Sequence, residues 1–198
     1  MDIMDRVKKI IMTPAIEWQV IKDENLTIAD MFKQYAVILA IIPAAAGFIG
    51  RTMIGMSVWG VSTRVSFFDG LAWAIMSYVM SLGGIFILGY IIDALAPTFG
   101  CQKDLNASMK TAVFSMTAGW LAGIFSLIPA LSILGIVGLY TFYLYYIGLR
   151  ELKNVPPDKL VGYYVVTLVI GLVVFLVMGI LVAAFTAGSY SGSYSGSW

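Results

Sequence analysis

Five long blocks of apolar residues constrain this chain more than any other feature of its sequence. A helix needs about 20 mainly apolar residues to cross a bilayer. Only 12% of the 198 residues are charged, whereas soluble domains carry about 25%. A water-soluble fold would have to expose the blocks, so we predict an all-α transmembrane bundle with five spanning helices. The blocks lie at about 32–53, 68–94, 109–128, 131–149 and 160–187.

Two prolines interrupt these blocks. Pro129 stands between the third and fourth blocks, and proline ends or kinks a helix because it lacks an N–H and clashes with the preceding turn. We expect a tight helical hairpin there; one long kinked helix is the alternative, although about 40 residues exceed a single crossing. Pro43 lies inside the first block, where we expect a kink or a break buried against neighbouring helices.

The basic residues predict an orientation. With five spans, ten of the twelve lysines and arginines fall in the connections on one side of the membrane. Cytoplasmic loops carry such an excess. We therefore expect the N-terminus in the cytoplasm and the C-terminus outside. A single crossing in place of the third and fourth spans would weaken this asymmetry.

The chain divides into three parts. Residues 1–31 contain isoleucines and valines at helical spacing among charged residues, which is typical of amphipathic helices at a membrane interface. They would serve for docking or curvature sensing, or would cover one end of the bundle, with Trp18 as an interfacial anchor. Residues 32–187 form the transmembrane domain. Residues 188–198 are a Gly/Ser/Tyr repeat that we expect to be flexible.

The chain offers little catalytic chemistry. It has no histidine and one cysteine, Cys101, so the commonest general base and metal ligand is absent. No P-loop, dinucleotide fingerprint or zinc spacing occurs. We predict no enzymatic activity, no cofactor and no bound metal. A net charge of +1 gives no indication of nucleic-acid binding.

A few polar and small residues remain as candidates. Asp93, near the end of the second block, is placed to pair with Lys110 at the start of the third, because intramembrane charges usually have partners and functions. The plainer interpretation is a salt bridge that sets the geometry of the loop. Gly119 and Gly123 match the small-residue helix-packing motif.

The order of these features resembles a known family. The pieces that carry the resemblance are Pro14 with Trp18, Phe99-Gly100 ahead of the Lys110 segment, and Ile147-Gly148-Leu149 ahead of a proline-containing loop. Over about residues 1–185 the chain is similar to the bacterial branch of the Yip (Ypt-interacting protein) domain family. The resemblance implies five spans and a cytoplasmic N-terminus. Eukaryotic relatives bind Rab-type GTPases, but their tyrosine-glycine-proline motif is absent here, so that activity does not carry over.

These observations lead to one hypothesis and two rivals. We expect an integral protein of a bacterial inner membrane that lacks catalytic groups and organises lipids or partners. Those partners would be other membrane proteins or a second copy of the chain. The alternative is a channel or transporter for a small solute or ion, with a water-filled path near Asp93 and Lys110. An intramembrane enzyme is the least supported class.

Overall fold

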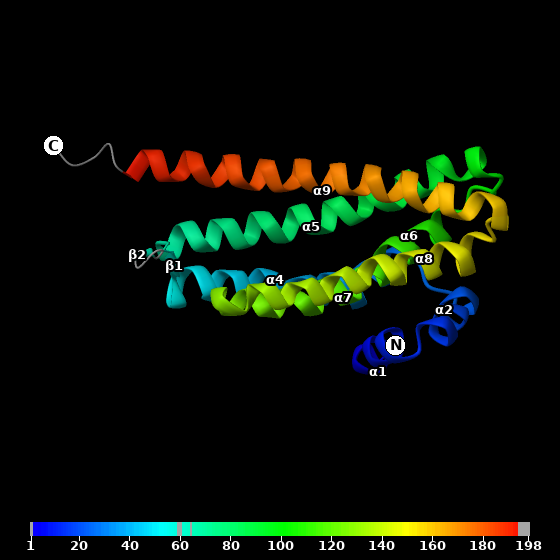
Figure 1. Ribbon diagram of the computed structural model, residues 1–198, viewed down its shortest axis with the longest axis horizontal. Helices are drawn as coiled ribbons and strands as arrows, with labels where there is room; N and C mark the ends of the chain where they lie inside the picture. The colour runs from blue at the N-terminus through cyan, green and yellow to red at the C-terminus, as the bar shows by residue number, and fades with distance from the viewer. Residues whose placement is uncertain (1, 59–60, 64, 194–198) are drawn as a thin grey trace.

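The protein is an elongated bundle of helices (Figure 1). The computed structural model describes residues 2–58, 61–63 and 65–193. Within these residues, four helical segments are long and apolar enough to cross a membrane. These segments are Ile28–Ile54, Phe67–Phe99, Ile133–Lys153 and Pro157–Thr186.

Two short helices precede the bundle and lie against its side near one end, as Figure 1 shows. Helix α1 spans Ile3–Met12, and the Asp2 side chain caps it by accepting hydrogen bonds from the Met4 and Asp5 amides. Helix α2 spans Pro14–Asp23 and begins at a proline, which suits a first helical turn because its missing N–H is not needed there.

The first long segment is continuous from α3 to η2. Its parts are α3 (Ile28–Met31), η1 (Phe32–Ala36), α4 (Val37–Ile49) and η2 (Gly50–Ile54), and the two η parts are π-helical. Helix α4 runs through Pro43. The segment ends at Gly55, whose φ of 79° lies in a region that favours glycine.

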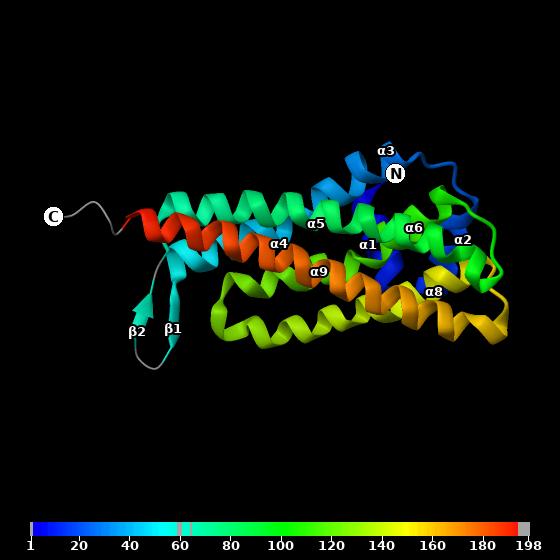
Figure 2. The same cartoon turned by 90° about the horizontal axis from the view of Figure 1, so that it is seen from above.

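A small hairpin follows this segment, where an all-α fold was expected to have a loop. Strands β1 (Met56–Val58) and β2 (Val61–Thr63) pair antiparallel, with Met56 opposite Thr63 and Val58 opposite Val61. Valine and threonine favour extended backbone, which explains the local departure from helix. The hairpin projects from the end of the bundle (Figure 2).

Helix α5 (Phe67–Leu95) is the central element. It packs against α4, α6 and α9. Ser66 caps its first turn, and the short 3₁₀ helix η3 (Ala96–Phe99) ends it at Gly100, whose φ is 77°.

The chain then forms the expected hairpin around Pro129. One arm comprises α6 (Leu105–Ser115), α7 (Thr117–Ala122) and η4 (Gly123–Leu127). The other comprises η5 (Pro129–Leu139) and α8 (Tyr140–Lys153), and both η elements are 3₁₀ helices. The arms pack against each other along their length, and Ile128 is the extended residue between them. Figure 2 shows the arms side by side.

The first arm is interrupted at Met116. The Thr117 hydroxyl donates to the Phe114 carbonyl at 2.6 Å, and the Met116 amide bonds to Val113 instead of a residue four back. Threonine hydroxyls compete in this way with the helical ladder. This break leaves the arm as short helices, which explains why the predicted third span is not among the four long segments.

Helix α9 (Pro157–Ser193) completes the bundle and packs mainly on α5. It follows Asn154, a left-handed residue that ends α8. The helix extends past residue 187, where we expected it to end, and residues 194–198 of the predicted tail lie outside the described residues. One continuous core of buried apolar side chains joins α1 and α2 to the bundle.

Candidate functional site

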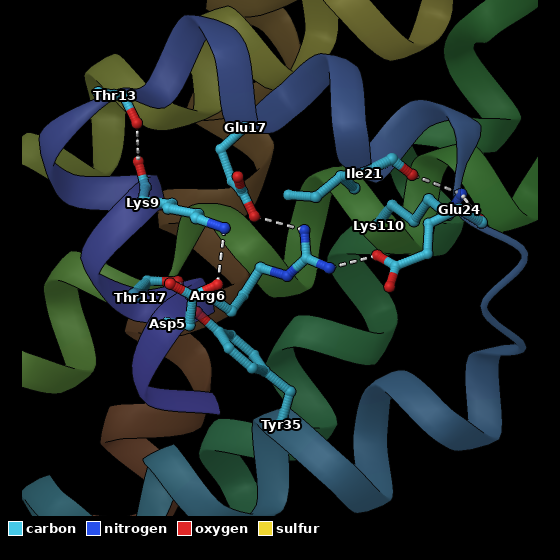
Figure 3. A network of polar contacts seen from close by, with 10 residues as sticks. All are labelled: Asp5, Arg6, Lys9, Thr13, Glu17, Ile21, Glu24, Tyr35, Lys110 and Thr117. Atoms are coloured by element: carbon cyan, nitrogen blue, oxygen red, sulfur yellow. Dashed lines mark hydrogen bonds and ion pairs between the residues drawn. The ribbon is translucent and has the colours of Figure 1, made fainter. Parts of the chain in front are cut away.

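The two N-terminal helices enclose a buried ion pair. Arg6 on α1 and Glu17 on α2 meet at 2.6 Å between Nη1 and Oε1, and their side chains are 6% and 5% exposed. The other terminal nitrogen of Arg6 contacts the Glu24 carboxylate at the end of α2. Figure 3 shows the guanidinium between the two carboxylates. The pairing holds α1 and α2 together at a charged contact that is largely hidden from solvent.

Lys110 of α6 extends this contact into the bundle. Its ammonium donates to the backbone carbonyls of Ile21 at 2.8 Å and Glu24 at 2.7 Å, and more weakly to that of Lys22 at 3.3 Å. The last carbonyls of a helix lack intrahelical partners and carry partial negative charge. Lys110 therefore caps the C-terminal end of α2 from a helix that lies far away in the sequence. We call Arg6, Glu17, Glu24 and Lys110 the N-terminal polar cluster.

The structure does not form the predicted pair of Asp93 with Lys110. Asp93 instead lies 3.7 Å from the Lys153 ammonium of α8 and 3.4 Å from the Ser108 hydroxyl, which itself donates to the Asp104 carbonyl at 2.8 Å. Successive helical residues are about 100° apart, so Ser108 and Lys110 are separated by about 200° around α6. Ser108 faces α5, and Lys110 faces α2 on the opposite side.

Lys153 has its own structural surroundings. Its side chain is 1% exposed, and its ammonium donates to the backbone carbonyls of Gln102 and Asp104, each at 3.2 Å. It thus fixes the loop before α6 to the end of α8. Asp93 therefore lies beside Lys153 at the end of α5, and the salt bridge predicted with Lys110 is not formed.

Trp18 is buried inside the protein, so its prediction as an anchor in the lipid interface is corrected. Its side chain has no exposed surface. It packs on Gly148 of α8, where an added Cβ would come within 2.8 Å of the ring, and edge-on to Phe114 at 6.5 Å between ring centroids. Trp18 therefore attaches α2 to α8 rather than to lipid.

The predicted packing glycines act within the chain. A Cβ on Gly123 would lie 2.5 Å from the Cβ of Pro43, and one on Gly119 would lie 3.1 Å from the Thr141 hydroxyl. The first contact joins the hairpin to α4 at its proline, and the second joins the two arms of the hairpin. Pro129 stands at the start of η5, where the hairpin turns.

Sequence reasoning missed three buried polar residues. Arg6 and Glu17 were not singled out, although Arg6 shares a helix face with the buried Ile10 and Glu17 shares one with the buried Ile21. Charges on an apolar face are the signal that would have found them. The third is Tyr35, fully buried, whose hydroxyl meets that of Thr117 at 2.7 Å.

The N-terminal polar cluster joins α1, α2 and α6 through contacts between its own charges and backbone carbonyls. Its two cations and two anions are matched in number, and each takes part in one of the contacts described above. Among the described residues no group of three or more His, Cys, Asp or Glu is placed to hold a metal ion. An apolar cavity of about 240 Å³ lies among α5, α6, α8 and α9, and neither Asp93 nor Lys110 lines it.

Comparison with known proteins gives the family. Residues 8–179 match the Yip1 domain. The chain belongs to the Yip1 domain family. This Yip1-domain chain is similar to Inner membrane protein YohC of Escherichia coli strain K12 and to the protein of the same name from Escherichia coli O6:H1 strain CFT073. Each is 31% identical over 172 residues, which cover 84% of the chain and 88% of the relative. No solved structure matches.

The match confirms the resemblance seen in the sequence, and with the four apolar helices it identifies a transmembrane protein. It includes Glu17, Glu24 and Lys110 of the polar cluster and begins two residues after Arg6. Neither of the two Escherichia coli relatives has an enzymatic name.

Proposed function

We propose that this protein crosses a bacterial inner membrane five times, with a cytoplasmic N-terminus, and organises lipids or membrane partners without catalysing a reaction. The hairpin supports the number of crossings, because its first arm runs antiparallel to α8 and would form a crossing beside the four long helices. The charge asymmetry supports the orientation. The name of the Escherichia coli relatives supports the location.

The observation that carries the organising role is the docking of α1 and α2. The N-terminal polar cluster and Trp18 hold them on the bundle, yet apolar side chains remain on their outer surface. Met4, Met12 and Ile16 are 70%, 79% and 64% exposed. Amphipathic helices with such faces lie in membrane interfaces or bind partners. We propose that residues 1–31 form an interfacial platform fixed to the transmembrane domain of 32–187, with the end of the chain outside the membrane.

Photo-crosslinking tests the platform. A benzophenone side chain at Met12 in the full-length protein, irradiated in native membranes, is expected to form adducts with phospholipid or with a membrane protein. The same group at Gln19, which is exposed on α2, serves as the control. If position 12 forms no more adducts than position 19, and neither position reacts with lipid or protein, the platform is wrong.

The orientation has a separate test. A reporter enzyme that folds only outside the cytoplasm is expected to be active when it is fused after the last residue, and inactive when it is fused before Ile3. Activity at both ends would mean an even number of crossings and would refute the five-crossing arrangement.

The alternative of a channel or transporter receives no support from a specific contact among the described residues. Its two proposed polar residues, Asp93 and Lys110, bind different partners on opposite sides of α6.

A further inference from the structure

The most informative unassigned feature is a groove on the surface of the hairpin. Its volume is about 720 Å³, its walls are mainly apolar, and both arms of the hairpin line it. Ile11 of α1 also lines it, beside Tyr140, whose hydroxyl donates to the Ile11 carbonyl at 3.1 Å. Ile124, Ile136 and Val137 in its walls are each more than half exposed. The groove is therefore open to the surroundings of the bundle.

The first long segment provides a scale for the depth of the groove in a bilayer. Lys33 and Arg51 are 18 residues apart on this segment, which is about 27 Å along a helix. This length is close to the hydrocarbon thickness of about 30 Å. The two charged residues therefore mark the two edges of the hydrocarbon layer, and Pro43 lies near its centre.

Two contacts transfer this scale to the hairpin. Tyr35, two residues from Lys33, meets the Thr117 hydroxyl at 2.7 Å. At the other level, a Cβ on Gly123 would lie 2.5 Å from the Cβ of Pro43. The lining residues of this arm run from Ala118 to Phe125. The groove therefore extends from the edge of the hydrocarbon layer on the N-terminal side to about its centre, which is the length of one leaflet.

Helix α1 lies at the headgroup end of this groove. It runs crosswise to the long helices in Figures 1 and 2, so its axis would lie parallel to the membrane plane, as in interfacial helices. Met4, Lys8 and Met12 are exposed and spaced four residues apart, so they form one stripe on α1. Lys8 precedes Ile11 by three residues and is its neighbour on the helix surface. The ammonium of Lys8 can therefore reach the headgroup level next to the groove.

The charge of this stripe is not balanced. Lys8 makes no ion pair within the part of the chain that the structure describes, whereas Lys9 pairs with Asp5 at 2.7 Å on the next face of α1. A lysine can bury its stem among apolar groups and keep its ammonium at the polar edge. A cation beside an apolar groove suits an amphiphile with an anionic headgroup and an acyl chain. A purely apolar partner helix would leave the ammonium without a counter-ion.

We propose that the groove binds one anionic phospholipid, whose phosphate pairs with the Lys8 ammonium and whose acyl chain lies between the arms of the hairpin. The proposal deepens the interfacial platform and rests on it, because α1 must lie in the membrane interface. It names the class of lipid that the platform holds and places it in the cytoplasmic leaflet of the proposed orientation. A zwitterionic lipid brings its own cation to the phosphate and binds less well.

Photolabelling with two lipids tests the site. The full-length protein is reconstituted in phosphatidylcholine nanodiscs with a small amount of phosphatidylglycerol or phosphatidylethanolamine that carries a diazirine midway along one acyl chain. Adducts are mapped by peptide mass spectrometry. Ile124, Phe125 and Ile136 are expected to form about five times more adducts with the phosphatidylglycerol probe, because a lysine near anionic lipid contributes about 1 kcal/mol. The exposed Val177 and Ile180 of α9 should show no preference.

Two lysines of α1 give a matched pair of variants, and both are exposed. Lys8→Gln removes the proposed counter-charge and is expected to lower the groove adducts of phosphatidylglycerol to the level of phosphatidylethanolamine. Lys9→Gln removes a lysine that pairs with Asp5, and it should keep the preference. Equal effects of the two variants would mean a general attraction of α1 to anionic lipid and would overturn the specific site.

Two residues of η5 test the groove itself. Val137 lines the groove, so Val137→Trp is expected to fill part of it and to reduce the groove adducts of both probes several-fold. Ile133 is 77% exposed on the same helix and lies outside the groove. Ile133→Trp should leave the adducts unchanged. Equal labelling in the two variants would refute an acyl chain in the groove.

The outcomes separate this site from the platform. If the benzophenone at Met12 labels lipid but the groove shows no preference for phosphatidylglycerol, the lipid site is wrong and the platform stands. If the benzophenone labels neither lipid nor protein, both are wrong. A second copy of the chain or another protein in the groove would shield it, so that both probes would label it less than α9. That result would also overturn the proposal.

Discussion

Replacing Arg6 with methionine tests whether the N-terminal polar cluster holds α1 and α2 on the bundle. Methionine keeps most of the length of the apolar stem and removes the guanidinium. The Glu17 carboxylate, whose side chain is 5% exposed, then loses its partner at 2.6 Å. The Glu24 side chain is 31% exposed, so water can solvate its carboxylate. The loss of its contact with Arg6 therefore contributes much less. The effect should therefore come almost entirely from the stranded charge of Glu17.

The magnitude follows from that stranded charge. Removing one partner of a buried ion pair costs about 3–5 kcal/mol. Because water partly screens the contact of Arg6 with Glu24, we expect the docking of α1 and α2 to weaken by about 3 kcal/mol. Each 1.4 kcal/mol corresponds to about a factor of ten. The opening equilibrium of α1 and α2 should thus increase by about a hundredfold, without unfolding of the transmembrane helices.

Hydrogen–deuterium exchange in nanodiscs measures this opening. Amides of α1 and α2 in Arg6→Met should exchange about a hundredfold faster, while those of α5 and α9 stay unchanged. The control is Lys9→Met, because Lys9 pairs with Asp5 at 2.7 Å on the exposed side of α1, where ion pairs contribute little. It should leave exchange unchanged.

A double variant decides between charge and packing. Arg6→Met with Glu17→Met removes both charges and should recover much of the lost protection, because a buried pair is often replaceable by apolar residues. Unchanged exchange in Arg6→Met would refute the reasoning. So would a double variant whose loss of protection free energy equals the sum of the losses in the two single variants.

Three further predictions concern the same end of the bundle. Gly148→Val should destabilise the docking of Trp18 by about 1–3 kcal/mol through overpacking, which would appear as faster amide exchange in α2. Gly83→Val, at a position with open space around it, should leave this exchange unchanged. Equal effects of the two variants would contradict the contact of Trp18 with Gly148. Lys110→Met should cost about 2–3 kcal/mol and expose the last turn of α2 to exchange, and retained protection there would argue against the capping role. Burial raises the pKa of the Cys101 thiol. In the folded protein this thiol should therefore react slowly with maleimide at neutral pH and faster as the pH rises. Rapid labelling at neutral pH would contradict the burial of the thiol.

The apolar segments could be predicted from the sequence because their length and composition alone decide the class. The hairpin at Pro129 was predictable for the same reason, since two blocks with a proline between them exceed one crossing. The interruption at Met116 was not, because it depends on whether the Thr117 hydroxyl takes a carbonyl from the helical ladder. Such competition is decided by local geometry that composition does not contain.

The polar contacts were harder to predict than the helices. Asp93 and Lys110 are close in the chain, but their meeting depends on the rotation of α6 about its axis, and the structure turns Lys110 toward α2. The actual partner, Lys153, comes from a helix that returns after the hairpin. Trp18 was ambiguous because an aromatic ring with one N–H suits both a membrane interface and a protein contact.

The capping of α2 by Lys110 has a consequence for biosynthesis. The N-terminal helices leave the ribosome first, but the residue that fastens them is made 86 positions after Glu24. At translation rates of about 5–20 residues per second, roughly 4–17 seconds pass before Lys110 exists. During that interval Phe114 and Gly148, the residues against which Trp18 packs, are also still missing. The nascent segment would rest on the bilayer surface, so the membrane itself would act as its temporary holder until the third apolar block emerges.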